Sequence, residues 1–195
     1  MGRMVCLFIM IFLISCSNKE GYRCEKRNVC PEGALFEAKT ALRKKDMMAF
    51  FETITDKEVR AKLKNSIGLC SSLKLDQVKK YGYKESTDCE LILNNYGWIE
   101  PEYQHPSEIT GLWESAIMRI SEPRKMLYEL EINHRKHSNA SSFVWRYLEP
   151  VKIIETVEDG NTAYSVVDWG GEKTKLLYYN TEAGWQFEQA PWEAY

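Results

Sequence analysis

The residues of this 195-residue chain best suited to chemistry are its six cysteines. Cys6 and Cys16 lie in and at the end of an apolar N-terminal run, whereas the other four are spread between positions 24 and 89. A thiol can carry a lipid, pair in a disulfide or bind a metal ion, and spacing and compartment decide which. The N-terminal segment predicts the cellular compartment of the protein. That compartment in turn decides whether disulfides are expected among these cysteines.

Residues 1–15 predict a secretory signal peptide. Arg3 supplies one positive charge, and the uncharged run "VCLFIMIFLIS" follows from Val5 to Ser15. This run is too short for a finished transmembrane helix, which needs about 20 apolar residues. A charged start, a short apolar stretch and a small residue at its end are typical of a segment that is removed on export.

The end of the run, Leu13-Ile14-Ser15-Cys16, resembles the lipobox of bacterial lipoproteins. The resemblance covers these four residues and the signal region before them. It implies cleavage before Cys16 and a diacylglycerol on its thiol, and two or more acyl chains give durable anchoring where one chain is marginal. It therefore implies a cell-envelope protein held to the membrane by lipid, with residues 16–30 as a tether. The sorting rule of enterobacterial lipoproteins, applied to Ser17, favours the outer membrane over the inner one. An ordinary secreted protein cut by the general signal peptidase is the alternative.

The exported chain keeps Cys24, Cys30, Cys70 and Cys89. An even number of cysteines in an exported protein predicts disulfides, and four cysteines allow three pairings. The short segment "CEKRNVC" and the proximity of positions 70 and 89 favour two local bridges, Cys24–Cys30 and Cys70–Cys89. A zinc site is the alternative, but the sequence has no C-x-x-C pair. We predict two disulfides and no metal site.

No catalytic arrangement is recognisable. The sequence contains no G-x-S-x-G, no phosphate-binding glycine loop and no H-E-x-x-H. His134 and His137 are spaced so that they could share a metal ion, but two cations near the end of a helix are also favoured by the helix dipole. We predict no catalytic residue, no metal and no cofactor.

The composition is that of one ordinary globular domain, with 44% hydrophobic and 28% charged residues. Removal of the signal peptide takes away Arg3 and no acidic residue, so 26 basic residues become 25 against 28 acidic ones, a net charge of −3. This balance, without a block of like charge, argues against a nucleic-acid partner.

Helical periodicity predicts three short helices between residues 31 and 70. Pro31 is a suitable first helical residue, the second helix follows in "MMAFFETI", and Thr55-Asp56-Lys57-Glu58 has the form of a capping box that starts the third. The positions expected to face inward are apolar: Leu35, Ala38, Leu42, Met47, Phe50, Phe51, Ile54, Val59, Leu63, Ile67 and Cys70.

The rest of the chain changes character twice. A strand is expected around Cys89 to Leu93, and helices return after Pro106 and again at Pro123. From residue 150 onward, four segments rich in β-branched and aromatic residues are separated by turn residues, which predicts an antiparallel meander. The expected fold class is α+β, with N-terminal helices packed on the concave face of a curved C-terminal antiparallel sheet and a helical insertion in the middle.

Two segments, "ALRKKDMMAFFETITDKEVRAKL" and "VEDGNTAYSVVDWGGEKTKLLYYNTEAGWQFE", resemble the nuclear-transport-factor-2-like superfamily, in particular small bacterial lipoproteins with that cone-shaped fold. The resemblance covers residues 31–70 and 150–190. It implies a single domain over residues 31–195, in which residues 71–149 form an enlarged helical middle. Some members are enzymes with a carboxylate and tyrosines inside the cone. Residues of these types are present on the predicted strands: Asp168, Tyr164, Tyr178 and Tyr179.

A fold by itself does not establish an activity. A strand-end aspartate and half-buried tyrosines are the favoured interpretation of those four residues, so we expect a non-catalytic envelope lipoprotein that binds a protein partner, a lipid or a small apolar ligand. A small-molecule enzyme, or an inhibitor or accessory factor of an envelope enzyme, is the alternative. Four aromatic residues belong either to a binding groove or to the core, which is favoured: Trp98, Tyr103, Trp113 and Trp145.

Overall fold

The computed structural model describes residues 22–72, 87–102, 109–137 and 148–189. The described residues form six helices followed by four strands. The helices are α1 (Pro31–Lys44), α2 (Met47–Phe51), α3 (Asp56–Ser72), α5 (Thr87–Asn95), α6 (Ile109–Met118) and α7 (Pro123–His137). The strands are β1 (Val151–Asp159), β2 (Thr162–Trp169), β3 (Glu172–Thr181) and β4 (Gly184–Gln189). The expected α+β class is confirmed, whereas the signal region, Cys16, Tyr103 and Trp145 lie outside the described residues.

Local sequence explains where the first helices begin. Helix α1 starts at Pro31, whose missing N–H costs nothing at a first helical position. Asp46 caps α2, because its Oδ1 accepts a hydrogen bond from the Ala49 N–H at 3.0 Å. Thr55 caps α3, because its Oγ1 accepts from the Glu58 N–H at 3.3 Å. The N-cap predicted from the sequence at Thr55 is therefore confirmed.

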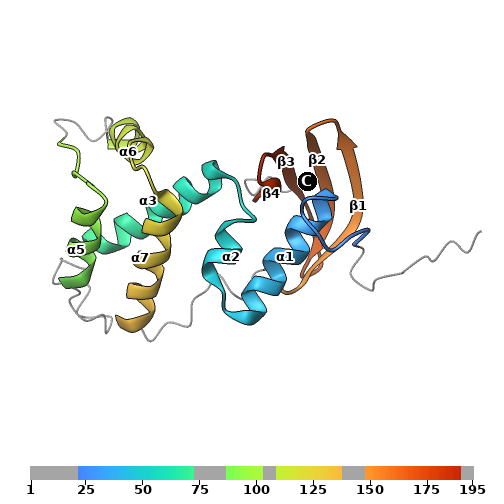
Figure 1. Ribbon diagram of the computed structural model, residues 1–195, viewed down its shortest axis with the longest axis horizontal. Helices are drawn as coiled ribbons and strands as arrows, with labels where there is room; N and C mark the ends of the chain where they lie inside the picture. The colour runs from blue at the N-terminus through green and yellow to red at the C-terminus, as the bar shows by residue number, and fades with distance from the viewer. Residues whose placement is uncertain (1–21, 73–86, 103–108, 138–147, 190–195) are drawn as a thin grey trace, which may run out of the picture.

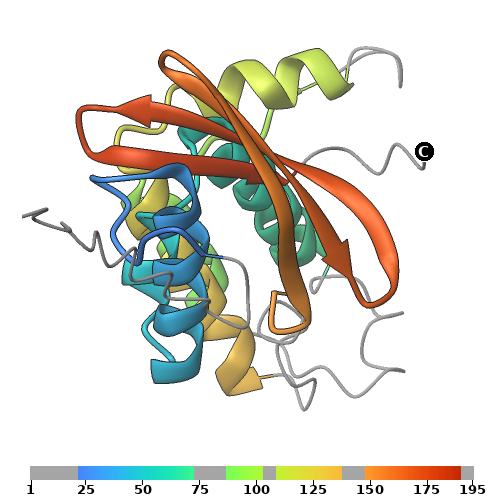
Figure 2. The same ribbon diagram turned by 90° about the vertical axis from the view of Figure 1, so that its right-hand side faces the viewer.

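The four strands form one antiparallel sheet in the order β1-β2-β3-β4, so each strand pairs with its neighbour in the sequence. The pairing of β1 with β2 is interrupted by a register shift between Ile153 and Glu155, which marks a bulge. Figure 2 shows the long strands twisting and curving over the helices. The predicted meander is confirmed.

The predicted helices of residues 31–70 divide between two neighbours. Helix α1 lies on the sheet and contacts β2, β3 and β4, whereas α3 packs mainly on α7 and reaches the sheet at β4. Figure 1 shows the result: α1 and the sheet lie at one end, α3, α5, α6 and α7 at the other, and α2 between them. One hydrophobic cluster contains residues of every described helix and strand.

The strand expected around Cys89 to Leu93 is wrong, because these residues belong to helix α5. A strand would place residues 89, 91 and 93 on one face. In the structure Cys89 and Leu93 are buried, but Leu91 is 60% exposed. That burial pattern has the i, i+4 spacing of a helix. The run is short, and a short apolar run has no decisive period of its own.

Candidate functional site

Two adjoining grooves lie beside the N-terminal half of α3, where the helical part of the molecule meets the sheet. The larger one, of about 860 Å³, runs between α3 and α6. The smaller one, of about 560 Å³, lies between the start of α3 and the β3–β4 turn. The α3–α6 groove is lined by residues that include Lys57, Arg60, Lys64, Glu114, Ile117 and Met118. The α3–sheet groove is lined by residues that include Thr55, Asp56, Arg124, Tyr179, Gln186 and Glu188.

The connection between α2 and α3 fixes the position of both grooves, because it is hydrogen-bonded to the edge of the sheet. The Thr55 N–H donates to the Phe187 carbonyl at 3.2 Å, and the Phe187 N–H donates to the Thr53 carbonyl at 3.0 Å. Gln186 adds a side-chain bond from Nε2 to the Glu52 carbonyl at 3.1 Å. The start of α3 is therefore held on β4, and the free edge of that strand is covered at this point.

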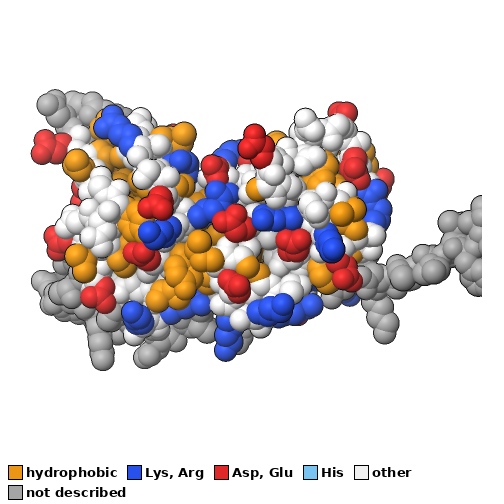
Figure 3. Space-filling model, in the orientation of Figure 1, with side chains coloured by type: hydrophobic (Ala, Val, Ile, Leu, Met, Phe, Trp, Pro, Cys, Tyr) orange, Lys and Arg blue, Asp and Glu red, His pale blue; other side chains and the backbone are white. Residues whose placement is uncertain are grey.

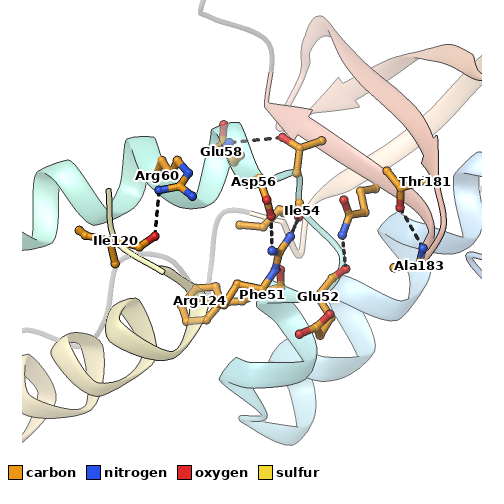
Figure 4. Close-up of polar contacts among 12 residues, drawn as sticks. Phe51, Glu52, Ile54, Asp56, Glu58, Arg60, Ile120, Arg124, Thr181 and Ala183 are labelled. Carbon is orange, nitrogen blue, oxygen red and sulfur yellow. Dashed lines mark hydrogen bonds and ion pairs between the residues drawn. The ribbon is translucent and has the colours of Figure 1, made fainter. Parts of the chain in front are cut away.

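Arg124, in the first turn of α7, ties the same connection to the helical part (Figure 4). Its Nε donates to the carbonyl of Phe51 at 3.0 Å, and its Nη2 donates to the carbonyl of Ile54 at 3.0 Å. Its Nη1 forms an ion pair with Asp56. A guanidinium presents several N–H groups in a rigid fork, so one side chain can satisfy three acceptors.

The α3–α6 groove combines charged and apolar groups. Arg60 Nη1 donates to the Ile117 carbonyl at 2.6 Å and to the Ile120 carbonyl at 3.4 Å, which satisfies backbone acceptors at the end of α6. Lys64 forms an ion pair with Glu114 at 3.5 Å from one helix to the other. Met118 is 65% exposed beside them. The groove therefore offers an apolar surface bordered by charges of both signs.

The charges at the start of α3 are held by partners. Lys57 Nζ lies 2.9 Å from Glu188 Oε2, and the Thr55 hydroxyl donates to Glu188 Oε1 at 3.0 Å. The hydrogen bond and the charge of Glu188 raise the pKa of Lys57. A lysine that acts as a base at neutral pH needs the opposite shift. Lys57 therefore stays protonated, and this arrangement suits recognition better than proton transfer.

The carboxylate and tyrosines suggested by the superfamily resemblance do not form one site. Asp168 Oδ1 accepts from the Gly171 N–H at 2.7 Å, so its carboxylate shapes the β2–β3 turn. Tyr178 is fully buried, whereas its neighbour Tyr179 lines the α3–sheet groove, since successive strand residues face opposite sides. The Tyr164 ring contacts the ammonium of Lys175 at 5.0 Å. Asp168, Tyr178 and Tyr164 therefore have structural contacts, and Tyr179 is the one of the four that lines a groove.

A buried polar cluster between α1 and the sheet was not expected from the sequence. Glu32 is 1% exposed and accepts from Arg23 Nε at 2.5 Å. Lys39 is 2% exposed and donates from Nζ to the Val151 carbonyl at 3.0 Å. Burial, with a smaller contribution from the charge of Glu32, raises the pKa of Tyr178. Charged residues within a helix are usually expected to face solvent. Here Glu32 contacts Arg23 and Lys39 contacts the Tyr22 ring, so the N-terminal segment also covers this cluster.

The cysteines pair as the sequence favours. Cys24 and Cys30 lie at disulfide distance with Cα atoms 6.2 Å apart, and Cys70 and Cys89 lie at disulfide distance with Cα atoms 5.8 Å apart. The second pair joins α3 to α5. The structure therefore agrees with the predicted pairing.

A histidine lies next to the second pair, which the sequence did not indicate. The His134 Nε2 on α7 is 3.6 Å from the Cys70 Sγ. Burial lowers the pKa of His134. The spacing by which His134 and His137 could share a metal ion is not tested, because the His137 side chain lies outside the described residues. His134 instead brings a third possible ligand to the two cysteines.

Two of the candidate groove aromatics belong to the core. Trp98 is buried, and its ring lies 5.2 Å from that of the partly buried Trp113 in an edge-on contact. The core interpretation of these two residues is therefore confirmed.

No protein-family model matches this chain, and no curated protein or solved structure matches it significantly. Among the described residues, no helix combines the length and the apolar character that a membrane span requires.

Proposed function

We propose that this chain is a bacterial lipoprotein, anchored to the cell envelope by lipid on Cys16, whose folded domain binds a protein partner in the α3–α6 groove without catalysis. The observation that carries the binding role is the groove itself. In it the exposed Met118 lies among charged side chains that form ion pairs or hydrogen bonds within this chain. Met is enriched at protein interfaces, where an apolar centre is surrounded by a polar rim.

The charge of the groove favours a protein over a lipid or a small apolar ligand. An apolar ligand would cover Lys57, Lys64 and Glu114 without replacing their contacts with water, which is costly. A protein segment with both charge signs can pair with them instead. On the face shown in Figure 3, basic and acidic side chains are interspersed, which supports a protein partner over a nucleic acid.

The cellular location rests on the N-terminal sequence. The apolar run ending in Leu13-Ile14-Ser15-Cys16 supports a lipid anchor, and Ser17 supports the outer membrane. The order of helices followed by a curved antiparallel sheet supports the resemblance to the nuclear-transport-factor-2-like superfamily. In this proposal residues 16–30 connect the lipid to a domain that recognises its partner close to the membrane.

Photocrosslinking in living cells of the source organism tests the groove. A photoreactive amino acid replaces Met118, and the control position is Ile154 on β1, which is 52% exposed. We expect a discrete protein adduct from position 118 that position 154 does not give. Lys64→Glu should weaken this adduct several-fold by placing two acidic residues across the groove, whereas Lys152→Glu on the exposed side of β1 should not. Equal adducts from both positions, or adducts with lipid alone, would contradict the proposal.

Membrane fractionation tests the anchor separately. The wild-type chain should take up labelled palmitate and remain with the membranes, whereas Cys16→Ser should do neither. If the Cys16→Ser chain stays in the membrane fraction and the wild type takes up no label, the lipid anchor is excluded. The proposal that the groove binds a protein is tested separately, by the crosslinking result.

A further inference from the structure

The Cys70–Cys89 pair and His134 form a compact cluster of three metal-binding groups at the junction of α3, α5 and α7. The two Sγ atoms and one imidazole nitrogen all lie within 4.8 Å of one another. Both cysteines are at most 2% exposed, and His134 is half-buried. Helices α3, α5 and α7 supply one group each, and His134 is the one that is distant in the sequence.

The distances match a tetrahedral zinc site once the sulfurs separate. Zn–S bonds of about 2.3 Å and Zn–N bonds of about 2.0–2.1 Å at a tetrahedral angle place S and N about 3.6 Å apart. The Cys70 Sγ and the His134 Nε2 are 3.6 Å apart in the structure. The same geometry requires the two sulfurs to be about 3.8 Å apart, which a broken disulfide permits.

The groups around the cluster suit a metal ligand. Ser66 and Cys70 are one turn apart on α3, and Glu131 and His134 are nearly one turn apart on α7. The Ser66 hydroxyl donates to Glu131 Oε1 at 3.0 Å, and the charge of Glu131 acts on His134. A carboxylate next to a ligating histidine is a common second layer of zinc sites. Thiolate and imidazole ligands together are typical of zinc.

We propose that the dithiol form of Cys70 and Cys89 binds one Zn²⁺ together with His134, so that this position alternates between a disulfide and a metal site. A dithiol reductant supplies two electrons and two protons, breaks the S–S bond and leaves as its own disulfide. Zinc then displaces the two thiol protons to solvent and accepts the lone pair of the neutral imidazole Nε2. A water molecule occupies the fourth position. In either form, α3 and α5 are held together.

The test uses the full chain in detergent, reduced with a phosphine under anaerobic conditions and titrated with Co²⁺ and then Zn²⁺. We expect one Co²⁺ per chain with thiolate-to-metal charge-transfer absorption, and its displacement by Zn²⁺. The oxidised chain should show no such absorption. His134→Gln should weaken Zn²⁺ binding by about tenfold or more, since even outer-layer partners of zinc ligands are worth that much. Cys24→Ser with Cys30→Ser should leave the absorption unchanged.

Two results would overturn the proposal. In the first, the reduced wild-type chain shows no thiolate-to-metal absorption, or a Cys70→Ser, Cys89→Ser chain still shows it. Either outcome would mean that the metal is not bound at this pair. The other is an unchanged affinity and spectrum in His134→Gln. Circular dichroism and mass spectrometry of the oxidised His134→Gln chain establish that its fold and disulfides are intact, so that a loss of binding reports on the ligand.

Discussion

Arg124 Nη2 donates to the backbone carbonyl of Ile54 at 3.0 Å, and Ile54 also forms a β-bridge with the edge of the sheet. The first turn of α7 is therefore linked to the sheet through Ile54. Ile54 lies between α2 and α3 and forms an isolated bridge with Phe187 of β4. The connection between α2 and α3 is therefore one place where the two halves of the molecule are joined. The stability of this junction should depend strongly on the arginine.

Arg124→Ala should lower the free energy of unfolding by about 1.5–3 kcal/mol, the range for hydrogen bonds to charged groups. Arg124→Lys should recover only part of this loss, because an ammonium cannot reproduce the fork that reaches two carbonyls. Urea unfolding followed by circular dichroism measures both. Arg119→Ala, at an exposed position after α6, is the matched control and should change stability by less than about 0.5 kcal/mol. Equal effects of the two alanine substitutions would show that the Arg124 bonds contribute nothing.

Gly33 allows the N-terminal segment to lie directly on α1. A Cβ atom at this position would collide with the backbone of Lys26 and Arg27. We expect Gly33→Ala to destabilise the protein by about 1–3 kcal/mol through this overpacking. Gly68→Ala on α3 is the matched control, because a Cβ there meets nothing within 4 Å. It should stabilise by up to about 1 kcal/mol through helix propensity. Thermal unfolding that moves in the same direction for both would contradict the expected collision.

Phe51 is 1% exposed at the end of α2, between the two halves of the core. Phe51→Ala should reduce the unfolding free energy by about 3–5 kcal/mol, because it removes buried apolar surface and leaves a cavity. Leu91→Ala, at a 60% exposed position, should have an effect below about 0.5 kcal/mol. Chemical denaturation compares the two. A loss at Phe51 no larger than that at Leu91 would mean that the junction is not packed as described.

The buried Tyr178 hydroxyl lies near the Ser165 side chain but makes no hydrogen bond that meets ordinary geometric limits. Tyr178→Phe should therefore stabilise the protein at neutral pH, by about 1 kcal/mol from the relieved desolvation.

The same residue should determine part of the alkaline stability. Burial raises the pKa of Tyr178 in the folded protein, whereas a tyrosine in the unfolded chain has a pKa of about 10. Above that pH the unfolded chain loses a proton that the folded chain keeps, so stability falls as pH rises. Tyr178→Phe should reduce the steepness of this fall, and Tyr164→Phe, at a half-buried position, should not. Identical alkaline unfolding of wild type and Tyr178→Phe would contradict the buried hydroxyl.

Local physical chemistry made several elements predictable from the sequence alone. Pro31 and Thr55 begin helices because their preference acts within one turn, and the turn residues between the C-terminal segments specify a meander of neighbouring strands. The two cysteine pairs were favoured because both are close in the sequence. The apolar positions of residues 31–70 identified most of the core of that region, since their spacing matches the helical period.

Only the tertiary structure decided the features that depend on distant residues. The segment at Cys89 is a helix because α3 and α7 supply a surface for its i, i+4 face, and its own short apolar run is ambiguous between strand and helix. Glu32 and Lys39 are buried between α1 and the residues that contact them from elsewhere, Arg23 on the first and Val151 and Tyr22 on the second. The grooves beside α3 arise where this helix meets α6 and the β3–β4 turn, and the approach of His134 to Cys70 arises from the packing of α3 on α7. A helix crossing depends on contacts between residues more than sixty positions apart, and such contacts leave no local pattern in a single sequence.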